Sequence, residues 1–330
     1  MRPSAIGLLL ILTLSLLVAP LAADAQPMVK GSRIGYLSSG YAGHQNTHAI
    51  LSGLRQGLGE LGWVEGQNLG IEARYAEGQI ERLPALAAEL VQLSVVVLFA
   101  VGPAPLLAAQ QATTQIPIVA IDLESDPVQS GFATSLARPG GTITGIFLDM
   151  PELVGKWLEL LTEALPQLTR VAVLWDPATG PVQREAAQAA ARRLAIAVQT
   201  LEVRTEAEIA PAVLAALPAR PDALLVLGSP FLGRHSKLIA EVTAHSQLPA
   251  LSLFLDFPEV GGLMAYGPSL PELYRRCGVQ ISKILHGAKP GDLPIERPVK
   301  FELVLNLKTA KALGLTLPPI LLVQADKVMQ

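Results

Sequence analysis

The sequence contains few cysteines, aromatic residues and charges. Its 330 residues include one cysteine, Cys277, and a single thiol excludes an internal disulfide, a cysteine-based zinc site and an iron–sulfur cluster. Aromatic residues make up 5% of the chain and charged residues 16%, whereas half are hydrophobic, which is enough to bury a globular core. The length suggests two domains or one large one. With 25 Lys and Arg against 28 Asp and Glu, the net charge of −3 argues against nucleic acid as a partner.

Long hydrophobic runs are also scarce, and the clearest one lies at the N-terminus. Residues 6–18 follow Arg2 and are largely apolar, but the run is shorter than the roughly 20 residues that span a bilayer as a helix. Ala23 and Ala25 then provide the small residues that a signal peptidase requires. The pattern predicts a secretory signal peptide over residues 1–25; an uncleaved N-terminal anchor is the alternative. We therefore expect an exported protein.

Two halves of the chain repeat the same order of expected elements. Short apolar runs that end in serine, glycine or proline alternate with segments whose hydrophobic residues fall at helical spacing. The expected strands are residues 33–38, 69–75, 95–101 and 117–123 in the first half, and 171–175, 197–203, 223–227 and 249–253 in the second. Strands alternating with helices predict parallel sheets covered on both faces, so each half should form a doubly wound α/β lobe.

A ligand site is expected between the lobes, where their strands end. Open α/β sheets bind ligands at the carboxyl ends of their strands. Helix N-termini in these turns suit a ligand carboxylate, and the acids at and just after the end of the expected strand 117–123, Asp122, Glu124 and Asp126, could hold a ligand ammonium. Serines and acids at such positions also cap helices and start turns. The candidate ligand-binding residues are Ser38, Ser39, Gly102, Asp122, Asp126, Trp175, Asp176, Gly228, Ser229, Asp256 and Tyr266.

These candidates predict a class of ligand. The serines and their turns would hold an anion, and Asp122 or Asp126 a cation. Trp175, Tyr266 and Phe254 are candidate aromatic walls for an apolar body. Asn and Gln, which a sugar site needs, are sparse at these strand ends. We therefore expect an amino acid or a related aromatic or branched acid rather than a sugar.

No catalytic motif is recognisable. The sequence has no phosphate-binding loop of the form G-x-x-x-x-G-K-[ST], no H-E-x-x-H and no G-x-S-x-G elbow, so we expect neither an enzyme nor a cofactor, and a secreted hydrolase is disfavoured. Residues 140–145 are rich in glycine but precede a strand, which indicates a turn. His44 and His48 have the spacing that begins a metal site on a helix, but no third ligand is marked, which favours exposed or capping histidines and no metal.

Several segments of the chain form a recognisable set of motifs. They are residues 54–68 (LRQGLGELGWVEGQN), 75–78 (YAEG), 126–128 (DPV), 135–141 (SLARPGG), 261–267 (GGLMAYG), 283–290 (KILHGAKP) and 301–315 (FELVLNLKTAKALGL). Together they resemble one large bacterial family, the periplasmic substrate-binding proteins of ABC transporters of the tryptophan/tyrosine type. The resemblance covers roughly residues 33–329, in order and with few gaps.

The resemblance implies a type I periplasmic-binding-protein fold, in which two α/β lobes joined by three hinge crossings close on a ligand. The expected first lobe comprises residues 31–146 and 262–295, and the second lobe residues 147–261 and 296–330. The expected partners are a small-molecule ligand and an ABC permease of the inner membrane with its ATPase subunit, and we expect a periplasmic monomer. A periplasmic sensor that docks on a receptor kinase is the alternative, because the same fold serves both roles.

The sequence departs from the family at two positions expected to face the cleft. Relatives often have Gly-Thr-Pro where this chain has residues 102–104, Gly-Pro-Ala. They often carry Arg-Glu where this chain has Leu255 and Asp256. The missing guanidinium means that the ligand of a relative cannot be transferred directly to this protein.

Overall fold

The first sheet is formed by the N-terminal part of the chain. The computed structural model describes residues 31–330 except residue 44, and within them this sheet has five strands, all parallel, in the order β2-β1-β3-β4-β5. They are β1 (Ser32–Ser38), β2 (Leu69–Tyr75), β3 (Val97–Val101), β4 (Ile118–Asp122) and β5 (Ile143–Phe147). The inner strands are continuous apolar runs because helices cover both faces of the sheet.

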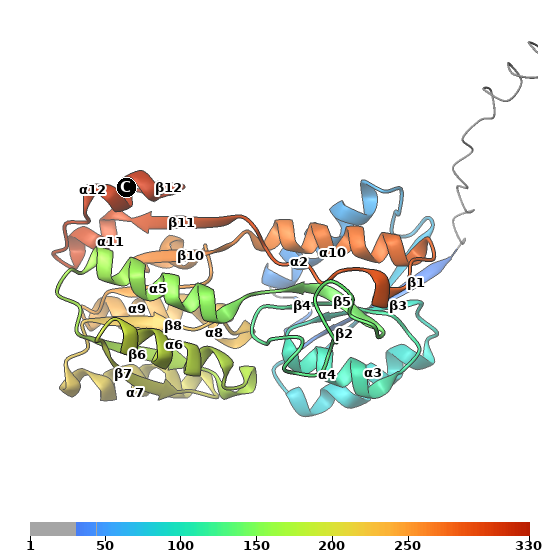
Figure 1. Cartoon of the computed structure of the whole chain (residues 1–330), viewed down its shortest axis with the longest axis horizontal. Coiled ribbons are helices and arrows are strands. Elements are labelled where there is room, and N and C mark those ends of the chain that lie inside the picture. The colour runs from blue at the N-terminus through green and yellow to red at the C-terminus, as the bar shows by residue number, and fades with distance from the viewer. Residues whose placement is uncertain (1–30, 44) are drawn as a thin grey trace, which may run out of the picture.

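Two pairs of helices enclose this sheet. They are α2 (Gln45–Gly59) and α10 (Leu270–Leu285) on one face, and α3 (Leu83–Gln92) and α4 (Pro103–Ala112) on the other, with a short 3-10 turn η1 (Ile80–Arg82) before α3. Figure 1 shows this lobe on the right, with α10 lying above the sheet and α3 and α4 below it. α10 comes from far along the sequence, so the lobe is completed only when the C-terminal part of the chain has returned.

The second sheet has the strand order β12-β11-β10-β9-β8-β6-β7, counting strands in the described residues only. They are β6 (Arg170–Trp175), β7 (Ala197–Glu202), β8 (Ala223–Val226), β9 (Ala250–Ser252), β10 (Met264–Pro268), β11 (Phe301–Asn306) and β12 (Lys327–Met329). β11 runs antiparallel to β10 and parallel to β12, whereas the remaining neighbours are parallel. The expected doubly wound arrangement is confirmed for both sheets, and β10, β11 and β12 extend the second beyond the strands expected from periodicity.

Helices also cover both faces of the second sheet. α5 (Met150–Ala164) packs on α6 (Val182–Arg193) on one face, and α7 (Glu206–Ala216) packs on α9 (Ser236–His245) on the other. The shorter elements are α8 (Pro230–Arg234), α11 (Leu307–Ala312), α12 (Pro319–Gln324), η2 (Pro177–Thr179), η3 (Leu217–Ala219), η4 (Phe257–Val260) and η5 (Pro290–Asp292). α8 matters most for function, because it begins directly after β8 at the edge that faces the first lobe.

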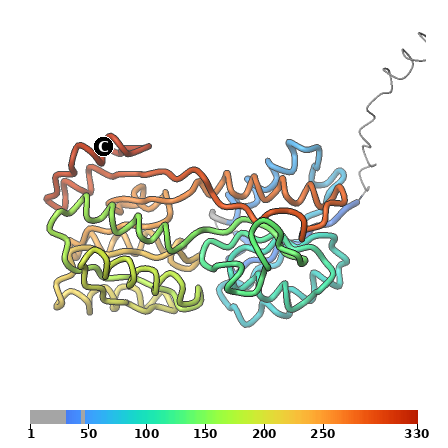
Figure 2. The backbone as a smooth tube through the Cα atoms, viewed as in Figure 1, coloured from blue at the N-terminus to red at the C-terminus, as the bar shows by residue number. Residues whose placement is uncertain are grey.

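Within the described residues, the chain crosses between the lobes three times. β5 leads into α5, β10 leads back into α10, and the segment after η5 leads into β11. The first and third crossings lie side by side, since the N–H of Phe147 donates to the carbonyl of Glu296 (3.0 Å) and the N–H of Glu296 donates to the carbonyl of Gly145 (2.9 Å). An ion pair between Arg297 and Asp149 also joins them. Figure 2 shows the crossings as one green segment and two orange-to-red segments.

The position of β10 corrects one boundary expected from the sequence. Residues 262–268 were expected in the first lobe, but β10 pairs with β9 and β11 in the second sheet. The chain therefore returns to the first lobe only after Pro268, where α10 begins. We propose crossings near residues 148, 268 and 298. The expected signal peptide, residues 1–25, lies outside the described residues.

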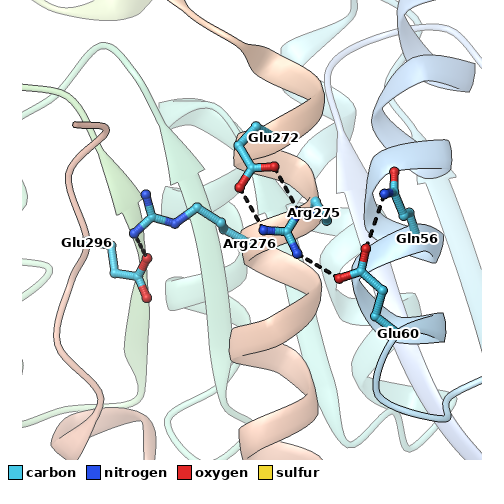
Figure 3. A network of polar contacts seen from close by, with 6 residues as sticks. All are labelled: Gln56, Glu60, Glu272, Arg275, Arg276 and Glu296. Carbon is cyan, nitrogen blue, oxygen red and sulfur yellow. Dashed lines mark hydrogen bonds and ion pairs between the residues drawn. The ribbon is translucent and has the colours of Figure 1, made fainter. Parts of the chain in front are cut away.

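Close packing of α2 against α10 holds the first lobe together. Gly57 of α2 lies so near α10 that a β-carbon there would overlap the backbone carbonyl of Arg275. Around this contact, the guanidinium of Arg275 bonds Glu272 and Glu60 (2.7 to 2.8 Å), and Arg276 pairs with Glu296 (Figure 3). Such half-exposed ion pairs contribute about 0–1 kcal/mol each. The small residue at the helix contact therefore matters more for stability than the polar network around it.

We predict that Gly57→Ala destabilises the protein by about 1–3 kcal/mol, because the added methyl group forces two packed helices apart. The matched control is Gly59→Ala, at the end of the same helix, where a β-carbon has no neighbour within 4 Å. That substitution should be neutral or stabilise by up to about 1 kcal/mol through the lower entropy of the unfolded chain. Urea denaturation of both variants measures the difference. Equal stabilities for the two would contradict the role assigned to the helix contact.

Candidate functional site

A cavity of about 360 Å³ lies between the two lobes. The first lobe contributes the turns after β1, β3 and β4 and the start of α10, and the second contributes α8 and residues 254–256. Most of the lining is apolar, with Ile50, Leu123, Phe254 and Leu270 among the residues that contribute. The cavity therefore combines the strand ends of both sheets, as expected for a site in an α/β protein.

The lobes touch beside this cavity, and a second cavity of about 410 Å³ lies beyond the contact. Gly102, Pro230 and Arg234 line both cavities. A β-carbon on Gly102 would lie 3.5 Å from Cγ of Pro230, and the guanidinium of Arg234 stands 4.9 Å from the ring centre of Tyr41. Both contacts join the first lobe to the second. The structure therefore represents an arrangement in which the lobes are closed on each other.

Five of the eleven residues expected to bind ligand line these cavities. Ser38, Ser39, Gly102 and Asp256 line the first cavity, and Asp176 lines the second. The hydroxyl of Ser38 accepts the N–H of Gly40 (3.0 Å), which orders the turn after β1. Asp256 is exposed at the rim, where partial desolvation and then the nearby Glu259 carboxylate raise its pKa.

Asp122 and Asp126 were expected to hold a ligand ammonium, but neither lines either of these two cavities. Asp122 is fully buried and accepts hydrogen bonds from the N–H groups of Glu124 and Ser125 (both 3.0 Å) and from the Ser125 hydroxyl. Asp126 accepts the N–H groups of Val128 and Gln129 (2.9 and 2.8 Å). Both carboxylates are thus occupied in holding turns, which is the alternative role that acids have at such positions.

Gly228 and Ser229 also lie outside both cavities. The amide of Gln183 receives the N–H of Gly228 (2.8 Å) and donates to its carbonyl (2.7 Å). The hydroxyl of Ser229 donates to Asp176 (2.6 Å) and accepts the N–H groups that begin α8. These contacts fix the turn after β8 and place α8 at the cleft, so the residues support the site from behind its surface.

The two aromatic walls expected from Trp175 and Tyr266 are absent from both cavities. Trp175 is buried in the second lobe, where its indole N–H donates to the carbonyl of Gly180 (3.1 Å) and its ring packs under Arg184 (4.6 Å). The ring of Tyr266 stacks on Phe301 of the neighbouring antiparallel strand (5.7 Å between centres). Among the aromatic residues named from the sequence as possible walls, Phe254 does line the first cavity.

Three cavity residues did not emerge as candidates from strand ends alone: Tyr41, Arg234 and Tyr274. Of the three acids at and just after the end of β4 that were considered for a ligand ammonium, Glu124 lines the cavity. Tyr41 and Arg234 stand several residues beyond β1 and β8. Tyr274 lies one turn inside α10. The turn at Pro268 and Ser269 carries the same strand-to-helix signal as the others and would have pointed to the start of α10.

Glu124 is the buried acid of the first cavity. It is 3% exposed, and its carboxyl group accepts a hydrogen bond from the N–H of Leu123 (3.0 Å). Burial raises its pKa well above the usual range, and the Asp122 carboxylate beside it raises it further. Burial also raises the pKa of Asp122, but four hydrogen-bond donors, the Glu124 carboxyl group among them, stabilise its charged form. Of the two acids, Glu124 therefore retains its proton to higher pH.

Metal and membrane features can be assessed for residues 31–330 without residue 44. No group of three or more His, Cys, Asp or Glu side chains in that range is placed to hold a metal ion. His44, one of the two spaced histidines, lies outside the described residues, and His48 is exposed on α2. None of the helices described is both long and apolar enough to cross a membrane.

Two α/β lobes, three crossings and a cavity enclosed at the strand ends define a two-lobed solute-binding protein of the type I periplasmic fold. Comparison with known proteins agrees with this class. The family described as ABC transporter substrate binding protein matches residues 41–329. The chain belongs to that family, as the sequence resemblance implied.

Individual relatives share the fold at low sequence identity. A tyrosine-binding protein of Clostridioides difficile (strain R20291) is 23% identical over 274 residues, which cover 82% of this chain and 78% of the relative. The ABC domain of a Streptococcus pneumonia protein in complex with L-Trp superposes with a TM-score of 0.83 at 24% identity, covering 91% of this chain and all of that one. A conserved domain protein of Vibrio cholerae gives 0.84 at 23% identity, with 90% and 99% covered.

Proposed function

We propose that this protein is the exported, monomeric solute-binding component of an ABC importer, without catalytic activity of its own. It captures a small organic solute between its lobes in the periplasm and delivers it to a permease with an ATPase subunit. The observation that carries the proposal is the cavity between the lobes, because residues of both line it. A solute bound there contacts both sides at once and stabilises the closed state by its higher affinity for that state.

An amino acid, or a related aromatic or branched acid, is the proposed solute. Two relatives are named for L-Trp and tyrosine, which favours this class. The cavity supports it on physical grounds, since apolar side chains and the Tyr274 ring line a volume of about 360 Å³. A sugar would need planar polar side chains around its hydroxyl groups, and the lining residues of the first cavity that the structure describes include no Asn or Gln.

A thermal-shift screen of the purified protein without residues 1–25 tests this proposal. The panel contains the twenty amino acids, their deaminated acids and a set of sugars. A binder present at 100 times its Kd should add about 2.7 kcal/mol of stability. Solution scattering with the best binder should then show a smaller radius of gyration and an unchanged mass, because the lobes close around the ligand.

The outcomes separate the parts of the proposal. Tight binding of a sugar with no amino acid or acid bound would refute the solute class. An unchanged scattering curve at saturating ligand would refute closure while leaving binding intact. Reconstituted uptake with the permease and ATPase subunits separates transport from the alternative role as a sensor for a receptor kinase, since only a transport component supports ligand accumulation.

A further inference from the structure

Glu124 has the properties of a receptor for a cation. The residue lines the first cavity although it is 3% exposed, so water solvates its carboxyl group poorly. Asp122 lies next to it, and the Asp176 carboxylate across the cleft is near enough to disfavour its charge. A buried group of acids of this kind is destabilised by its own repulsion, and a ligand ammonium would relieve that repulsion.

Arg234 has the complementary properties on the other lobe. It stands at the end of α8 and lines the cavity that contains Glu124. Its guanidinium lies over the rings of Tyr41 and Phe231, at 4.9 and 5.9 Å, and no carboxylate of the described residues forms an ion pair with it. Arg275, outside the cleft, pairs instead with two carboxylates (Figure 3). Arg234 thus keeps its planar donors for a carboxylate from outside the chain.

We propose that the cleft selects zwitterionic solutes, with Glu124 of the first lobe receiving the cationic amine and Arg234 of the second lobe receiving the anionic carboxylate. This deepens the proposed function and rests on it. The two charges stand on opposite lobes, with Ile50 and Phe254 among the apolar residues that line the same cavity. A solute that carries both charges can therefore satisfy both lobes when they close, whereas a solute with one charge leaves a desolvated group unpaired.

Calorimetry with related solutes tests the assignment. The probes are L-tryptophan, tryptamine and 3-indolepropionate, and L-leucine, 3-methylbutylamine and 4-methylpentanoate; within each set the amine lacks the carboxylate and the acid lacks the ammonium. Wild-type protein should bind at least one amino acid about 10- to 100-fold more tightly than its amine and its acid. Glu124→Gln should abolish the preference for the amino acid over its deaminated acid and keep the preference over its amine. Arg234→Gln should abolish the preference for the amino acid over its amine and keep the preference over its acid.

Asp256→Asn tests the other acid that lines the first cavity, as a competitor to Glu124. The matched controls are Glu81→Gln and Arg193→Gln, which remove exposed charges that line neither cavity. Both controls should leave the two preferences as they are in wild type. Melting temperatures of all five variants, compared with wild type, exclude a trivial loss of fold.

Each possible outcome supports or overturns one part of the assignment. If an amino acid binds wild type but Glu124→Gln weakens the amino acid and its acid equally, the assignment of Glu124 is overturned and the proposed function stands. If Arg234→Gln weakens the amino acid and its amine equally, the assignment of Arg234 is overturned. If the preference over the acid is lost in Asp256→Asn and kept in Glu124→Gln, the assignment of Glu124 is overturned. In both cases the proposed function stands. If wild type binds the deaminated acid as tightly as the amino acid, the zwitterion selection alone is overturned. If nothing in the wider screen binds, the proposed function is refuted as well.

Discussion

The affinity of the cleft for an amino acid should rise with pH, by up to about tenfold for each pH unit below the pKa of Glu124 in the ligand-free protein. Burial and the Asp122 carboxylate raise that pKa well above the usual range for glutamate. A protonated carboxyl must lose its proton before it can pair with an ammonium group, so binding releases a proton. Isothermal titration calorimetry in buffers of different ionisation enthalpy measures this release directly.

Other charged groups around Glu124 shape this dependence. Asp176 faces it from the second lobe and also raises its pKa, whereas Tyr274 of α10 stays neutral because burial raises the pKa of its own hydroxyl. In Glu124→Gln the affinity should be lower and nearly independent of pH, while Glu81→Gln, at an exposed acid that lines neither cavity, should keep the slope of wild type. A wild-type affinity that does not change with pH, or an equal slope in Glu124→Gln, would contradict the assignment.

The same carboxyl group should make the ligand-free protein less stable as pH rises. A raised pKa means that the folded state binds more protons than the unfolded state, whose glutamate titrates near about 4.3. The contribution of Glu124 to stability is therefore fully present below that pH and is lost as the pH rises through the folded-state pKa. Each unit of difference corresponds to about 1.4 kcal/mol. Glu124→Gln should raise the melting temperature at neutral pH while it weakens ligand binding, an opposition that a purely structural residue would not produce.

Hydrophobic runs made most of the strands predictable from the sequence. The apolar run at 223–227 became β8 with one residue fewer, and residues 69–75, expected from their alternation of apolar and polar residues, became β2 with identical bounds. These runs are unambiguous because buried parallel strands are apolar throughout and end at residues that favour turns. β10 is harder, since residues 264–268 contain a glycine and a proline and owe their strand form to pairing with β9 and β11. Long-range pairing of this kind leaves no local signal.

The residues of the candidate site also fall into those that the sequence predicts and those that it does not. The turns after β1 and β3 were identified correctly as cavity walls, because topology alone brings strand ends to one edge. Which acid of the turn 122–126 enters the cavity depends on hydrogen bonds that engage Asp122 and Asp126 and leave Glu124 at the surface of the cavity. Arg234 reaches the site only because α8 meets Tyr41 of the other lobe. Contacts between lobes cannot be derived from the pattern of one segment.

Replacing Gly102 should have the largest effect on ligand binding. Gly102 stands at the start of α4 where the lobes meet, and a β-carbon there would already lie 3.5 Å from Pro230. The longer side chain in Gly102→Leu would overlap the second lobe in the closed state but not when the lobes are apart. Overpacking of about 1–3 kcal/mol, applied to the closed state alone, lowers affinity by roughly 5- to 150-fold.

Gly180→Leu provides the matched control, because backbone strain affects both positions alike. Gly102 has φ 92° and ψ 168°, and Gly180 has φ 75° and ψ 178°. Residues other than glycine rarely adopt this backbone conformation. A β-carbon on Gly180 has no neighbour within 4 Å. Both variants should lose stability, but only Gly102→Leu should lose affinity and keep a large radius of gyration when ligand is added. Equal affinities for the two variants would show that the lobes do not close at Gly102 when ligand binds.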